Sequence, residues 1–100
     1  MLHTVNKSPF ERNTLESCLR VALKDSTILL IEDGVYAATK GTTHSPRVEE
    51  ATKDFQLFVL GPDLAARGIV QEKLINGITV VDYAGFVDLV EQHSAVQSWL

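Results

Sequence analysis

The chain has a single cysteine, Cys18, among its 100 residues, so it cannot form an internal disulfide. A free thiol fits a reducing compartment. No segment approaches the roughly 20 apolar residues that a membrane-spanning helix needs. The first five residues also lack the basic and apolar regions of a signal peptide. We therefore expect a cytoplasmic protein without a membrane segment.

Clustered basic residues are also missing. The nine Lys and Arg residues are scattered and the net charge is −4, whereas a nucleic-acid-binding surface needs basic side chains gathered together. The six glycines are isolated, and they form neither a phosphate-binding loop nor a dinucleotide fingerprint. No Gly-x-Ser-x-Gly motif of a serine hydrolase occurs. We expect no direct nucleic-acid partner and no cofactor.

Metal-ligating residues are equally sparse. His3, His44 and His93 lie far apart in the chain, and with one cysteine they do not have the spacing of a zinc site. We therefore expect no metal. His3 lies in a β-branched, apolar-leaning segment, which favours a structural histidine over a catalytic one.

What the sequence does contain is a central stretch, Thr27 to Ala38, in which four aliphatic residues run into Glu32-Asp33-Gly34. An uninterrupted aliphatic run that ends in turn residues indicates a strand covered on both faces. Apolar patterns and turn signals predict the other elements. The further strands are expected over residues 2–5, 55–60 and 78–81. The first helix is expected to begin between residues 9 and 14 and to run to residue 23, and the other helices are expected over residues 48–52, 64–67 and 83–92.

Strands that alternate with helices predict an α/β fold with a mostly parallel sheet, here as one domain over residues 1–100. Only two of the expected helices are full length, so four strands would keep uncovered apolar surface. We expect a partner subunit to cover it. Residues 35–38 are candidates for that contact. Trp99 either joins such an interface or folds back on its own chain.

Two positions could carry chemistry. Cys18 is the only obvious nucleophile, but it shares a helical face with Leu15 and Leu19, which favours packing over a reactive thiol. Glu32 and Asp33 stand at the end of a predicted strand, where they could bind a ligand or a metal or act as acid and base. The simpler interpretation is that Asp33 caps the next helix and Gly34 permits a tight turn. Asp63 and Asp82 are expected to be helix caps for the same reason.

Several separate motifs, in order along the chain, resemble the DsrH/TusB family. They are Leu2-His3-Thr4-Val5-Asn6-Lys7-Ser8-Pro9-Phe10, Glu32-Asp33-Gly34-Val35-Tyr36-Ala37-Ala38, Leu60-Gly61-Pro62-Asp63-Leu64-Ala65-Ala66-Arg67-Gly68, Val81-Asp82-Tyr83-Ala84-Gly85-Phe86-Val87-Asp88-Leu89 and the ending at Trp99. The extended opening motif and Cys18 are most similar to the DsrH branch, the small subunits of DsrEFH complexes.

The resemblance implies a three-layer α/β fold of the DsrE-like type, with helices on both faces of the sheet. It implies an accessory subunit of a cytoplasmic sulfur relay, in which persulfide sulfur passes between cysteines during intracellular sulfur oxidation. The partners would be DsrE-like and DsrF-like homologous subunits, in a hetero-hexamer with two copies of each. The sulfur acceptor would be a DsrC/TusE-like protein.

Two alternatives stay open. The chain could be the TusB-like subunit of the relay for 2-thiolation of the tRNA wobble uridine. Cys18 could also be a sulfurtransferase centre in its own right. The resemblance itself implies a lesser role, because the principal sulfur-carrying cysteine would belong to the DsrE/TusD-like subunit. Cys18 would then be a secondary sulfur carrier, and the chain an accessory part of a sulfurtransferase complex.

Overall fold

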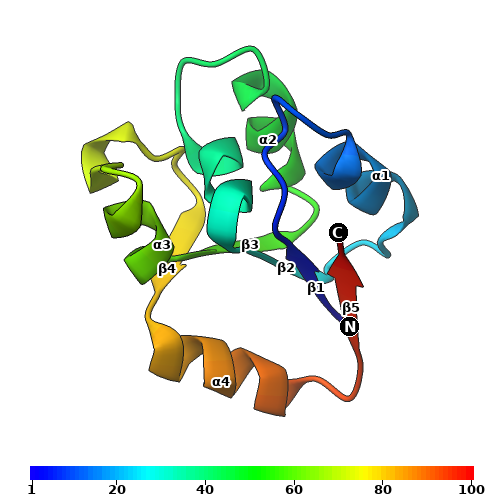
Figure 1. Cartoon of the computed structure of the whole chain (residues 1–100). Coiled ribbons are helices and arrows are strands. Elements are labelled where there is room, and N and C mark those ends of the chain that lie inside the picture. The colour runs from blue at the N-terminus through cyan, green and yellow to red at the C-terminus, as the bar shows by residue number, and fades with distance from the viewer.

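A five-stranded, entirely parallel sheet forms the centre of the molecule, in the order β4-β3-β2-β1-β5 (Figure 1). All 100 residues are described by the computed structural model. The strands are β1 (Leu2–Val5), β2 (Thr27–Leu30), β3 (Gln56–Leu60), β4 (Ile78–Val81) and β5 (Val96–Trp99).

Helices cover both faces of this sheet. The α-helices are α1 (Thr14–Val21), α2 (Ser45–Ala51), α3 (Gly61–Ala66) and α4 (Tyr83–Gln92), and the 3-10 helices are η1 (Glu32–Ala38) and η2 (Gln71–Lys73). Figure 1 shows α1, α2 and α3 on one side and α4 alone on the other. None of the helices is both long and apolar enough to cross a membrane. The three-layer α/β architecture is the one expected.

The topology explains why α4 lies apart from the others. From β1 to β4 the chain steps along the sheet in one direction, and it then returns across the whole sheet to place β5 beside β1. Parallel crossovers are right-handed, so reversing the direction of travel moves the connecting helix to the opposite face. The single helix α4 therefore covers a face that spans five strands.

The expected four-strand sheet was wrong at the end of the chain. Residues 96–99 form β5, which pairs with β1 in the register Leu2 with Val96 through Val5 with Trp99. The segment Val-Gln-Ser-Trp is short and mixed in polarity, so it does not show the pattern of a buried strand. It is an edge strand held by backbone pairing, and Trp99 folds back on its own chain.

Two apolar layers form the core. The larger lies between the sheet and α1–α3, and the smaller joins Leu2 and Leu29 to Leu89 of α4. Val35, Ala37 and Ala38 are buried in the larger layer, so the expected partner contact was wrong for these three residues, whereas Tyr36 is partly exposed. The apolar η1 packs inward because it follows β2 directly and lies above the sheet.

Other local expectations were confirmed or adjusted. Asp82 caps α4 as predicted, because its Oδ1 accepts a hydrogen bond from the Gly85 backbone N–H at 2.8 Å. On α4 only Leu89 is buried, whereas Val87 and Val90 are exposed, so the helix rests on the sheet through a narrow apolar face.

Candidate functional site

The carboxyl ends of β1, β2 and β3 meet at one edge of the sheet, since all three strands are parallel. This is the edge at which open α/β sheets place ligands. Asn6 follows β1, Glu32 follows β2 and Asp63 follows β3. The fold therefore brings together three polar residues that are far apart in the sequence.

Glu32 has a strained backbone at this edge. Its φ of 50° is in the left-handed region, which residues other than glycine rarely adopt. Two neighbouring strand ends hold it there: its backbone N–H donates to Asp63 Oδ2 at 2.6 Å, and its Oε2 accepts from Asn6 Nδ2 at 3.3 Å. Asn6 Oδ1 is buried without a hydrogen-bond partner. Asp63 thus ties β3 to β2, and its predicted role as a helix cap was wrong.

Asp33 does not cap the helix that follows it either. η1 has no side-chain cap, and Asp33 Oδ1 instead lies 2.9 Å from both Nε and Nη2 of Arg67. Arg67 also donates to the backbone carbonyl of Asp63 at 3.2 Å. This ion pair links the end of β2 to the end of α3. Sequence reasoning missed Arg67 and Asn6, although both stand in motifs that carried the family resemblance.

Gly34 is needed because η1 lies very close to the end of β1 at this position, and not because the turn requires an unusual backbone angle. Its φ is not positive, but a Cβ at this position would overlap the carbonyl oxygen of Val5. The glycine therefore lets η1 begin directly against the end of β1. The three carboxylates at this edge are fixed by partners of the chain itself, and no group of three or more His, Cys, Asp or Glu residues could hold a metal ion. Such an edge can position loops or bind a polar surface.

Cys18 lies away from this edge, in the larger core layer. Its side chain is 0% exposed, and burial raises the pKa of its thiol to about 12. A thiol with that pKa is protonated near neutral pH, and the thiolate is the nucleophilic form. The amphipathic pattern that placed it beside Leu15 and Leu19 was confirmed. In the isolated chain, the geometry favours a packing role for Cys18 over a role as a reactive thiol.

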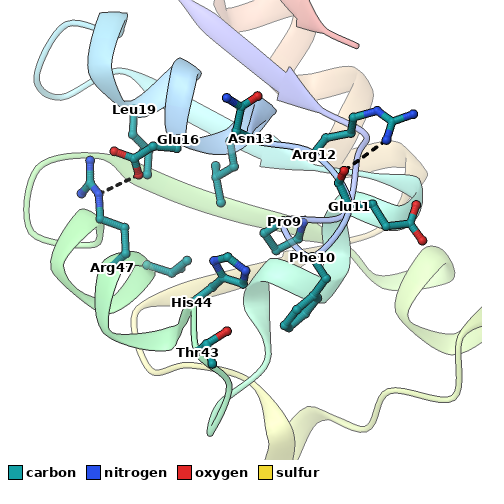
Figure 2. A pocket seen from close by; sticks show the side chains of 12 residues that line it. Pro9, Phe10, Glu11, Arg12, Asn13, Glu16, Leu19, Thr43, His44 and Arg47 are labelled. Carbon is teal, nitrogen blue, oxygen red and sulfur yellow. Dashed lines mark hydrogen bonds and ion pairs between the residues drawn. The ribbon is translucent and has the colours of Figure 1, made fainter.

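A cavity of about 460 Å³ opens beside α1 and α2, lined by the segment after β1 and the loop before α2 (Figure 2). The rings of Phe10 and His44 meet edge to face, with the ring centroids 4.8 Å apart. Across the cavity Arg47 Nε donates to Glu16 Oε2 at 3.0 Å. Cys18 is not among the lining residues. The cavity thus offers aromatic and charged groups but no thiol, and no sequence motif pointed to it.

Comparison with known proteins decides the family. The family described as "DsrH like protein" matches residues 7–96. The chain belongs to the DsrH/TusB family. Curated members with the name "Protein TusB", from Shigella flexneri and from Escherichia coli O1:K1, are each 33% identical over 99 residues. Each alignment covers 99% of this chain and 100% of the relative.

Solved structures of proteins with distant sequences show the same fold. The ychN protein from E. coli superposes with a TM-score of 0.78 at 17% identity, covering 98% of this chain and 97% of that one. MTH1491 from Methanobacterium thermoautotrophicum, titled a protein of unknown function, gives a TM-score of 0.73 at 16% identity, with 97% and 96% covered. At these identities the likeness concerns the fold alone.

Proposed function

We propose that this DsrH/TusB family member is the TusB-like subunit of a sulfur relay for 2-thiolation of the tRNA wobble uridine. The pathway rests on full-length similarity to proteins with the name TusB. This pathway replaces sulfur oxidation, which the resemblance to the DsrH branch implies, as the leading interpretation. The subunit acts in the cytoplasm, with two homologous partner subunits in a hetero-hexamer and a DsrC/TusE-like acceptor.

Within that relay we propose an accessory role. The observation that carries it is the burial of Cys18, the only cysteine of the chain, with a thiol pKa of about 12. A persulfide forms by attack of an exposed thiolate, and this chain presents none. Its contribution would then be to hold the subunits that carry the sulfur, through surfaces such as the carboxyl edge of the sheet.

The test is complementation in an E. coli strain that lacks TusB and its two partner subunits. The chain is expressed there with the two homologous subunits from its own organism, and 2-thiolated wobble uridine is measured in digested tRNA by mass spectrometry. We expect thiolation to return, and to disappear when this chain alone is omitted. Absence of thiolation despite a purified, intact complex would contradict the proposal.

Sulfur oxidation is the second candidate, because the matching family is described by its DsrH members. It predicts that deleting this chain in its own organism stops oxidation of stored sulfur but leaves tRNA thiolation unchanged. Cys18 as a secondary carrier or as a sulfurtransferase centre stays a separate prediction. It requires the complex to open the α1 layer, so that sulfur from a donor adds to Cys18 and is detected there by mass spectrometry.

A further inference from the structure

The basic residues of the chain are confined to one part of the sequence, whereas the acidic residues are not. All nine Lys and Arg residues lie within residues 1–73, whereas residues 74–100 contain Asp82, Asp88 and Glu91 and no Lys or Arg. This last segment, which forms β4, α4 and β5, carries three of the four net negative charges. Helix α4 therefore carries acidic side chains and no basic ones.

Helix α4 carries apolar side chains that do not pack on the sheet, in addition to those that do. Phe86 and Leu89 pack onto the sheet and belong to the smaller core layer. Tyr83, Val87 and Val90 follow at helical spacings of four and three residues, so they share one flank of α4. They are 61%, 54% and 38% exposed. We call these three residues the α4 stripe.

The surroundings of the α4 stripe are open. Helix α4 alone crosses this face, whereas α1, α2 and α3 cover the other (Figure 1). Val96 of β5 pairs in register with Leu2, whose side chain faces α4, so Val96 adds a further exposed apolar side chain to the α4 side. Asp88 and Glu91 are exposed on α4 next to the α4 stripe. The result is an apolar strip with an acidic border.

We propose that the α4 stripe docks a partner protein whose matching surface is apolar and bordered by Lys or Arg side chains. Apolar burial supplies the affinity, and opposite border charges select and orient the partner. A second copy of this chain docked through the same face would place Asp88 and Glu91 against their equivalents, and like charges would repel. Nucleic acids and anionic membranes are disfavoured for the same reason.

This inference rests on the proposed function for the identity of the partner, which would be one of the two homologous relay subunits. The probe is therefore the pair of these subunits from the same organism, co-expressed and purified with this chain. Binding is measured as a dissociation constant by titration of the purified chain into the other two subunits, at low and at high salt.

Two variants test the surface and two matched controls test the interpretation. Val87→Asp puts a charge into the α4 stripe, and Asp88→Lys with Glu91→Lys reverses its border. Val21→Asp changes a valine on α1 that is 65% exposed, and Glu49→Lys with Glu50→Lys reverses two exposed carboxylates on α2. Circular dichroism and thermal unfolding verify that all four variants fold.

We expect both α4 variants to weaken binding by about tenfold or more and both controls to stay within about twofold. Salt should weaken binding of the wild type more than that of the charge-reversed variant. If the wild type binds but the α4 variants bind equally well, the docking surface is wrong and the proposed function stands. If Val87→Asp dissociates a homodimer of this chain and leaves binding to the two other subunits unchanged, the occupant of the α4 stripe is a second copy and the proposal is wrong. If the wild type binds neither subunit, both proposals are overturned.

Discussion

The indole of Trp99 donates a hydrogen bond from Nε1 to Nδ1 of His3, at 3.0 Å, across 96 residues of sequence. The contact joins edge strand β5 to β1, the strand on which the chain begins. His3 is buried, and two causes lower its pKa from the ordinary value of 6.5: desolvation first, then the positive charge of the N-terminus. The bond requires an unprotonated Nδ1, so the docking of the last strand depends on a neutral His3.

The first prediction is therefore a loss of stability in acid. The unfolded chain binds a proton at His3 more readily than the folded chain, so the free energy of unfolding is constant above pH 6.5 and falls as the pH drops through the lowered pKa of the folded state. Urea unfolding between pH 5 and 8 measures this. His3→Asn, which offers an acceptor that does not titrate, should flatten the slope, whereas His44→Asn should keep it.

The second prediction concerns the donor. Trp99→Phe keeps an aromatic ring beside α1 but removes the N–H, which leaves Nδ1 of buried His3 unpaired. We expect a loss of about 1 kcal/mol in the free energy of unfolding, the usual cost of one such hydrogen bond. Because Trp99 is the only tryptophan, unfolding is followed by circular dichroism. Leu100→Ala, at a side chain 80% exposed, should change nothing, and an equal loss there would contradict the argument.

The third prediction tests the strain at Glu32. Glu32→Gly and Glu32→Ala both remove the contact with Asn6, but only glycine adopts a φ of 50° without cost. The glycine variant should be the more stable of the two by about 1 kcal/mol, measured by urea unfolding. Equal stabilities would show that the backbone at Glu32 is not strained. A fall in complex assembly despite unchanged stability would give the carboxylate a binding role.

The fourth prediction separates two reasons why a position requires glycine: a lack of space for a side chain and a positive φ. Gly34→Ala should cost about 2–3 kcal/mol, because its methyl group overlaps the backbone of Val5 and neither strand β1 nor helix η1 can move freely. Gly41→Ala meets no atom within 4 Å but keeps a φ of 73°, so it should cost only about 1 kcal/mol. Thermal unfolding of both variants checks the order, and the reverse order would refute the steric explanation.

The fifth prediction is that Cys18 is protected. In the folded chain at pH 8, reaction with a disulfide reagent should be slower by about a thousandfold or more than in urea, because labelling requires local opening of a fully buried thiol. Absorbance of the released thiol follows the reaction. Rapid labelling of the native chain would contradict the burial, and rapid labelling only within the assembled complex would support the carrier role.

Local sequence patterns predicted the parts of the fold that depend on neighbours in the chain. The aliphatic run into Glu32 predicted β2, and Asp82 predicted the start of α4. Both predictions succeed because the burial of a strand and the capping of a helix depend on a few adjacent residues. The amphipathic spacing around Cys18 predicted its burial. The motifs also predicted the family, which the comparisons showed.

What the tertiary structure decided depends on contacts between distant segments. β5 exists because β1 offers it an edge, and its own four residues carry no strand pattern. Asp33 and Asp63 could each have been a cap in isolation, but parallel strands bring Arg67 and the Glu32 N–H within their reach, and these partners are better placed than the nearby helix ends. Val35, Ala37 and Ala38 looked available for a partner and are buried, because η1 follows β2 directly onto the sheet. The sequence by itself determined strands β1 to β4, the four α-helices and the family to which the chain belongs. Only the folded arrangement decided that residues 96–99 form a fifth strand, which carboxylates hold the strand ends together and which apolar surface, the α4 stripe, stays exposed.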